Sequence, residues 1–169
     1  MPDGTYIMNS FKIAQVLEEL YPTPSLPPTS PIQQKYFDVL SEAWNIMEPI
    51  KFSFVPRRLL NEVNYPYWRA TRSENIGKPM SQAELDAIFE AASPHMRPVT
   101  AMLKEKSGEG PFFMGDTITF TDAVHAGILI MMRRLGDDVF HPFLKALGDK
   151  DVHLKFLETV KPWTERDDH

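Results

Sequence analysis

The sequence contains no cysteine among its 169 residues. This excludes disulfide bonds, thiolate nucleophiles, and zinc or iron–sulfur sites with cysteine ligands. No two of the five histidines have the i, i+4 spacing of a helical metal pair. We therefore expect no metal site, and we interpret His125, which falls within an apolar segment, as a hydrogen-bonded core residue.

Long hydrophobic runs and an excess of basic charge are also absent. The longest apolar run, residues 123–132, is interrupted by a histidine and is far shorter than the ~20 residues that span a bilayer. The 18 basic residues are outnumbered by 23 acidic ones, which gives a net charge of −5 and argues against a nucleic-acid partner. The first residues lack the basic and apolar regions of a signal peptide. We expect a cytoplasmic protein that binds neither nucleic acid nor a membrane.

Proline, in contrast, is abundant: 15 residues, nearly twice the usual share of about 5%. Five of these prolines lie in residues 21–31. Such a segment is stiff and cannot donate a regular ladder of hydrogen bonds. We therefore divide the chain into a short N-terminal unit, residues 1–22, a proline-rich linker, residues 23–31, and a larger unit, residues 32–169.

The unit before the linker predicts a turn, a short strand and one helix. Asp3-Gly4 is a strong turn signal, and residues 5–8 have a composition typical of strands. Four apolar residues at i, i+3, i+4 and i+7 then predict a helix over about 10–20: Ile13, Val16, Leu17 and Leu20. Tyr21-Pro22 ends this helix.

The larger unit predicts helices throughout. Ser30-Pro31-Ile32-Gln33 and Ser81-Gln82-Ala83-Glu84 are capping boxes, and helical patterns cover about 31–47, 55–70, 81–106, 119–135, 141–147 and 151–160. Thr119 and Asp122 precede an apolar segment, and we interpret this pair as a structural cap. Because apolar residues surround that segment on nearly all sides, it predicts a buried central helix. The fold class is mainly α.

One pattern of residues allows a binding site. Asn9-Ser10 lies at the junction of the predicted strand and helix, where backbone N–H groups, a hydroxyl and an amide can together hold a carboxylate. Plain capping of the helix is the alternative interpretation. The glycines at 108, 110 and 115 match neither a dinucleotide fingerprint nor a P-loop.

Longer segments resemble the glutathione transferase family. Residues 3–22 resemble the last strand and helix of its thioredoxin-like domain, and residues 21–31 resemble its interdomain linker. Residues 110–127, Gly-Pro-Phe-Phe-Met-Gly-Asp-Thr-Ile-Thr-Phe-Thr-Asp-Ala-Val-His-Ala-Gly, resemble its helical-domain signature. Residues 67–79 are similar to a segment of fungal transferases related to bacterial β-etherases. The resemblance implies the family's C-terminal helical bundle, preceded by a β–α remnant of the thioredoxin-like domain.

The chain also departs from the family. A full member begins with the rest of the thioredoxin-like domain, which supplies the catalytic Tyr, Ser or Cys and a cis-proline beside glutathione. Neither can be assigned here, so the catalytic residue is unknown and the chain looks N-terminally truncated. In addition, Asn9 stands where the family usually places an acidic residue or glutamine.

The resemblance nevertheless implies two parts of a site. Asn9 and Ser10 correspond to the residues that bind the γ-glutamyl end of glutathione. The first long helix of the helical domain forms the wall of the second-substrate site, and here it carries Trp44, Met47, Lys51, Phe52, Phe54 and Arg57. An apolar wall with a few cations suits a hydrophobic or a conjugated, oxygenated acceptor. For each aromatic residue, core packing is the alternative.

Two functions follow as expectations. The first is a transferase or isomerase that uses glutathione as co-substrate and no metal. It would act as a homodimer on a hydrophobic electrophile, in fungal secondary metabolism or detoxification. The isomerase would add glutathione to a double bond, let the resulting single bond rotate, and expel glutathione again. The second is a non-catalytic module of the same fold that docks a partner protein or stores an apolar ligand.

Overall fold

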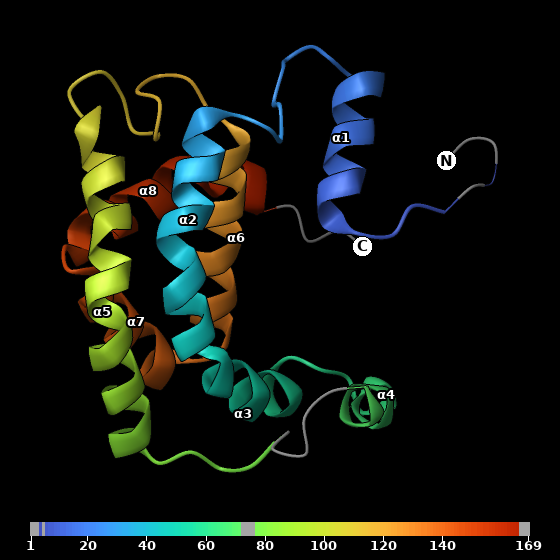
Figure 1. The fold of residues 1–169 in the computed structure, drawn as a ribbon, viewed down its shortest axis with the longest axis vertical. Coiled ribbons are helices and arrows are strands. Elements are labelled where there is room, and N and C mark those ends of the chain that lie inside the picture. The colour runs from blue at the N-terminus through green and yellow to red at the C-terminus, as the bar shows by residue number, and fades with distance from the viewer. Residues whose placement is uncertain (1–3, 5, 72–76, 166–169) are drawn as a thin grey trace.

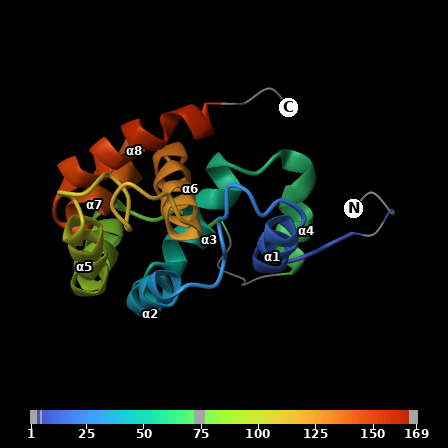
Figure 2. The same cartoon turned by 90° about the horizontal axis from the view of Figure 1, so that it is seen from above.

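The computed structural model describes residues 4, 6–71 and 77–165. In order, its helices are α1 (Ser10–Leu20), α2 (Pro31–Ile46), α3 (Glu48–Arg58), the 3₁₀ turn η1 (Glu62–Asn64), α4 (Tyr65–Ala70), α5 (Gln82–Glu105), α6 (Phe120–Arg134), α7 (Asp137–Leu147) and α8 (Lys150–Thr164). Helices α2, α5, α6, α7 and α8 form a bundle, with α3 at one end and α1 and α4 to one side (Figures 1 and 2). The prediction of a mainly α fold is confirmed.

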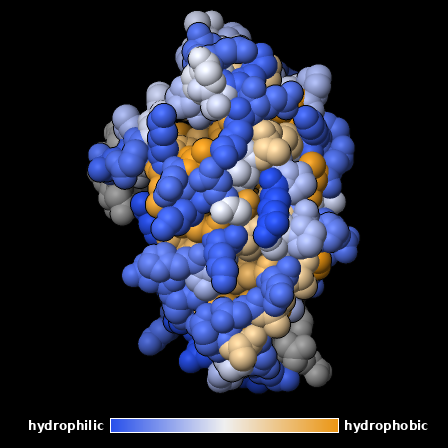
Figure 3. Space-filling model, turned by 90° about the vertical axis from the view of Figure 1, so that its left-hand side faces the viewer, coloured by the Kyte–Doolittle hydropathy of each residue, from blue (hydrophilic) through white to orange (hydrophobic). Residues whose placement is uncertain are grey.

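The core lies where α5 packs against α2 on one side and α7 on the other. Its largest buried side chains come from all five bundle helices and include Tyr36, Met96, Leu129, Leu147 and Phe156. Helix α5 runs unbroken through two internal prolines, and the side chain and backbone of Ser81 exchange hydrogen bonds with Glu84 at its start. The side of the molecule formed by α5 and α7 is mostly hydrophilic, with apolar side chains showing between the polar ones (Figure 3).

Helix α1 stands beside the α2–α6 pair and buries none of its residues (Figures 1 and 2). Its attachment runs through the linker: the Glu18 carboxylate accepts hydrogen bonds from the Leu26 N–H at 2.7 Å and from the Ser25 hydroxyl. The predicted apolar face of α1 is exposed, with relative accessibilities of 39% for Ile13, 51% for Leu17 and 49% for Leu20.

The predicted strand at residues 5–8 is not formed over Tyr6–Met8, the part of that segment that the structure describes. Thr5 and Asp3 lie outside the described residues. A strand is stabilised by pairing with a neighbour, and within the described ranges the β contacts are two isolated bridges at residues 112–117. Composition alone therefore overestimated the tendency of this segment to extend into a sheet.

The start of α6 is organised by Asp122, which is fully buried. Its carboxylate accepts hydrogen bonds from the Thr119 N–H at 2.7 Å, the Thr119 hydroxyl at 2.6 Å and the Phe113 N–H at 3.0 Å. The loop can close because residue 110 is a glycine: a Cβ there would lie 2.3 Å from the backbone of Gly115. Helix α6 buries one face, while Ala123 and Gly127 are exposed, so the prediction of a buried central helix was right for that face and wrong for the other.

Candidate functional site

The first part of the candidate site is the start of α1. Asn9 has a backbone φ of +88°, a conformation that is rare for residues other than glycine but comparatively common for asparagine. Its side-chain oxygen accepts hydrogen bonds from the Phe11 N–H at 3.0 Å and the Lys12 N–H at 3.3 Å. Asn9 thus caps the helix, and this oxygen is already occupied.

Ser10 has hydrogen-bond donors that are free to bind a ligand. Its side chain is exposed, and neither its hydroxyl nor its N–H bonds to any residue in the described part of the chain. Helix α1 begins at its lower end in Figure 1, the end nearer to α3 and α4. The start of α1 therefore offers two free donors at the positive end of a helix dipole, where an anion is stabilised.

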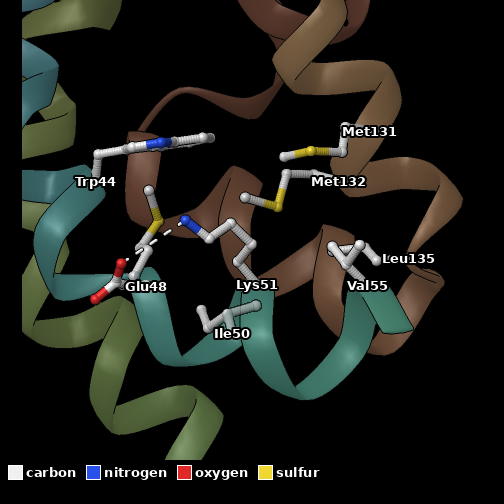
Figure 4. A pocket seen from close by; sticks show the side chains of 9 residues that line it. Trp44, Glu48, Ile50, Lys51, Val55, Met131, Met132 and Leu135 are labelled. Atoms are coloured by element: carbon white, nitrogen blue, oxygen red, sulfur yellow. Dashed lines mark ion pairs between the residues drawn. The ribbon is translucent and has the colours of Figure 1, made fainter. Parts of the chain in front are cut away.

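The second part is a pocket between the end of α2, α3 and the end of α6, which we call the α2–α3–α6 pocket (Figure 4). Its walls are mostly apolar and are formed by Trp44, Met47, Glu48, Ile50, Lys51, Val55, Met131, Met132 and Leu135. The space that a water-sized sphere can reach inside is about 10 Å³. An acceptor molecule would therefore enter only if side chains move, and methionines are well suited to such movement.

Charge at this pocket is limited to one cation and one anion. The Lys51 ammonium lies 3.8 Å from a Glu48 carboxylate oxygen, and the two side chains are 39% and 56% exposed. The same ammonium lies 4.9 Å from the centre of the Phe52 ring. A pair this long and exposed is weak, so Lys51 can turn to a polar group of a ligand at little cost.

The structure brings only part of the predicted wall together. Trp44, Met47 and Lys51 line the pocket, whereas the other three residues do not. Phe52 packs edge-on against Trp68 at 6.1 Å between ring centres, and Phe54 is buried beneath the Arg58 guanidinium. Arg57 is exposed on the surface outside the pocket.

Three of the predicted wall residues lie outside the pocket because the segment is two helices, α2 and α3, and not one continuous helix. Helix α2 ends at Ile46, and α3 restarts at Glu48 with Pro49 in its first turn. Proline is favoured at this position because it has no N–H to leave unpaired. The new helix has its own direction and its own faces, so a spacing counted from Trp44 does not carry into α3.

Sequence reasoning missed the wall contributed by α6. Met131, Met132 and Leu135 come from its last turn and the residue after it. One feature of the sequence could have indicated this wall, namely the broad apolar pattern of the helix. In the structure Leu129 and Met132 are fully buried, whereas Met131 is only partly buried and faces the pocket.

Arg58 holds the α3 and α6 walls of this pocket in position. Its guanidinium makes two hydrogen bonds to the Asp138 carboxylate, at 2.7 and 2.8 Å, and a third to the Leu135 carbonyl. These bonds to Arg58 hold the pKa of Asp138 below its usual range. Because Leu135 itself lines the pocket, the end of α3 is joined directly to the end of α6.

The described ranges contain neither a metal-binding cluster nor a membrane-spanning helix. No group of three or more histidine, aspartate or glutamate side chains there is placed to hold a metal ion. None of the helices in those ranges combines the length and the apolar character needed to cross a bilayer.

Comparison with known proteins agrees with this architecture. The family described as "Glutathione S-transferase, C-terminal domain" matches residues 31–141, more than half of the chain. The chain belongs to this family, as its sequence motifs indicated. No curated protein matches it.

Among solved structures, the chain is similar to a glutathione S-transferase of Ceriporiopsis subvermispora crystallised in complex with glutathione. The TM-score is 0.66 at 23% sequence identity, over 95% of this chain and 68% of that one. At this identity the likeness shows a shared fold. The α2–α3–α6 pocket and the start of α1 therefore lie on a glutathione transferase-like scaffold.

Proposed function

We propose that the protein acts with glutathione on a hydrophobic, electrophilic small molecule bound in the α2–α3–α6 pocket, in secondary metabolism or detoxification. The reaction is conjugation, or isomerisation through addition and elimination of glutathione. The observation that carries the proposal is an apolar pocket with one ammonium group at its rim, on a chain of the glutathione transferase family.

The chemistry that suits these walls is addition to a double bond conjugated with a carbonyl group. The glutathione thiolate forms a C–S bond to the electron-poor carbon, and the π electrons move to the carbonyl oxygen. The Lys51 ammonium is available to stabilise that negative charge. A proton added at the neighbouring carbon gives the conjugate, whereas rotation and loss of the thiolate give the geometric isomer.

Glutathione would be held at the start of α1. Its γ-glutamyl carboxylate accepts hydrogen bonds from the Ser10 hydroxyl and the Ser10 N–H. Asn9 keeps the backbone at the start of α1 in the conformation that exposes these two donors. No described residue is assigned as the group that activates the thiol.

The test is a reaction of the full 169-residue chain with glutathione and 4-phenyl-3-buten-2-one, followed by loss of the enone absorbance. We expect a rate above the uncatalysed reaction and a kcat at least fivefold lower in Lys51→Met. The matched control is Lys35→Met, since Lys35 also forms an exposed ion pair, with Glu105 at 3.4 Å, but lies outside the pocket. If the two variants react at equal rates, Lys51 takes no part in the reaction. If the wild type does not accelerate the reaction, the proposal of an enzyme is wrong.

A second candidate function is a non-catalytic module of the same fold. The observation in its favour is the exposed apolar face of α1, which suits a partner protein. This function predicts no acceleration of the enone reaction, together with a partner interaction that is lost when Leu17 is replaced by glutamate.

A further inference from the structure

A second cavity lies between α1 and the N-terminal half of α2, beside the end of the linker. It shares no lining residue with the α2–α3–α6 pocket. A water-sized sphere can reach about 410 Å³ of it, which is enough for a small organic molecule. Besides two prolines, its lining consists of Phe11, Thr29, Ser30, Gln33, Gln34 and Phe37.

The unusual feature of this cavity is Gln33, which is only 3% exposed. Its side-chain oxygen accepts a hydrogen bond from the Thr121 hydroxyl at 2.9 Å. Its side-chain nitrogen, Nε2, has no partner in the described part of the chain. Buried polar groups are nearly always paired, so the unpaired and enclosed Nε2 of a residue that lines a cavity is an exception.

A second polar group of the lining, the Ser30 hydroxyl, is also able to donate. The Ser30 oxygen accepts the Gln33 backbone N–H at 3.2 Å, which leaves its hydroxyl hydrogen free for a ligand. The Gln34 amide, by contrast, is engaged with Asp38 at 2.7 Å. No lining side chain carries a negative charge, and the start of α2 adds a partial positive charge. The cavity is therefore suited to a hydrogen-bond acceptor, and to an anion in particular.

Two aromatic rings complete the cavity from its two sides. Phe11 of α1 is 38% exposed and Phe37 of α2 is 44% exposed, so both rings have surface left for a ligand. Aromatic rings pack favourably against one another. We infer that this cavity binds a small aromatic carboxylic acid, whose ring packs against Phe11 and Phe37 and whose carboxylate accepts a hydrogen bond from Ser30 Oγ and, when the Gln33 amide turns toward the ligand, a second one from Gln33 Nε2.

The probe for this site is 4-fluorobenzoate, titrated into the full chain without glutathione and followed by fluorine and nitrogen-15 NMR. We expect saturable binding and a shift of the Gln33 side-chain amide signals. 4-Fluorobenzylamine has a similar ring but carries a positive charge, and it should bind at least tenfold more weakly. Equal binding of the two probes would indicate apolar partitioning and would overturn the inference.

Two leucine variants distinguish the contribution of the buried Gln33 amide to binding from that of the neighbouring Gln34 amide. Gln33→Leu removes the unpaired donor and should weaken 4-fluorobenzoate binding at least tenfold, while Gln34→Leu, in the same cavity, should change it less than twofold. Unchanged affinity in Gln33→Leu overturns the site. If Gln33→Leu fails to fold, the NMR signals of the Gln33 side-chain amide in the wild type provide the test. Signals that do not shift at saturation with 4-fluorobenzoate also overturn the site.

The inference is independent of the proposed glutathione chemistry. Ser10→Ala should leave 4-fluorobenzoate affinity unchanged, because Ser10 does not line this cavity. If the chain binds 4-fluorobenzoate through Gln33 but does not catalyse the reaction of glutathione with the enone, the inferred site stands and the proposed function is wrong.

Discussion

The imidazoles of His125 and His153 are joined by a hydrogen bond of 3.1 Å between Nε2 of the first and Nδ1 of the second. Both side chains are buried, with relative accessibilities of 1% and 0%. Because His125 belongs to α6 and His153 to α8, this contact joins two helices through polar groups in the middle of the core.

The direction of this hydrogen bond follows from its neighbours. The Thr100 hydroxyl donates its one hydrogen to the Leu147 carbonyl at 2.7 Å, so it must accept from His153 Nε2, also at 2.7 Å. His153 Nδ1 then accepts from His125 Nε2, and His125 Nδ1 accepts from the Tyr36 hydroxyl at 2.8 Å. Every member is satisfied only when both imidazoles are neutral.

This chain of hydrogen bonds predicts instability in acid. Burial lowers the pKa of His125 well below its usual value, with a further contribution from His153. Burial also lowers the pKa of His153 to about 4, although Asp149 opposes this shift and Lys104 adds to it. Below pH 6.5 the unfolded chain therefore binds more protons than the folded one, and the free energy of unfolding falls as the pH falls toward 4. The loss approaches ~1.4 kcal/mol per pH unit for each histidine.

Urea unfolding at pH 7.5, 6 and 5 measures this loss. The exposed His141 provides the control, since His141→Gln should leave the pH dependence unchanged. A free energy of unfolding that stays constant from pH 7.5 to 5 would show that the two buried histidines are not kept neutral.

Tyr36→Phe should destabilise the fold at neutral pH. The Tyr36 hydroxyl is the donor to His125 Nδ1, and its removal leaves a buried nitrogen unpaired, at a cost of ~1–3 kcal/mol. Tyr67→Phe, at a side chain that is 68% exposed, should change stability by less than ~0.5 kcal/mol. Thermal and urea unfolding of the two variants give the comparison, and equal stabilities would argue against the hydrogen-bond chain.

Asp122→Ala should cost more than an exposed helix cap does. A cap lost from a helix end typically costs ~1 kcal/mol, but Asp122 is fully buried and its removal leaves three donors without an acceptor, one of them the Phe113 N–H nine residues away. We expect a loss of ~3 kcal/mol or more, measured by urea unfolding. Asp116→Ala, at an exposed position in the same loop, should have little effect. Affinity of the folded fraction for ligands should not change.

The local features of the fold could be predicted from the sequence, because they depend on neighbouring residues. Ser30 and Ser81 mark the starts of α2 and α5 through hydrogen bonds within four residues. The pocket could not be predicted in the same way: Met131 and Trp44 are 87 positions apart, and only the packing of α6 against α2 and α3 brings them to one cavity. The predicted strand failed for a related reason, since pairing depends on residues elsewhere.

A second copy of the chain is our proposed partner for the exposed face of α1. Ile13, Leu17 and Leu20 form an apolar row that the described part of the chain leaves 39–51% exposed, and such surfaces favour association. Sedimentation at tens of micromolar should show a dimer, and Leu17→Glu should shift it to monomer without loss of helicity. Glu19→Lys, a charge change at another exposed α1 position, is the control. A wild-type monomer at that concentration would refute the dimer.

Glutathione should bind this chain weakly, in the millimolar range, as measured by calorimetry. We assign the hydroxyl and N–H of Ser10 as the donors for its γ-glutamyl carboxylate, since the Asn9 side chain is held at the helix start by the two backbone hydrogen bonds that its oxygen accepts. A hydrogen bond to a charged group contributes ~1.5–3 kcal/mol, so two such bonds give roughly 3–6 kcal/mol, close to the ~4 kcal/mol of a 1 mM dissociation constant. Ser10→Ala removes one of them and should weaken binding about tenfold, whereas Ser25→Ala, in the linker, should not. Micromolar affinity that is unaffected by Ser10→Ala would place the glutathione site elsewhere on the protein.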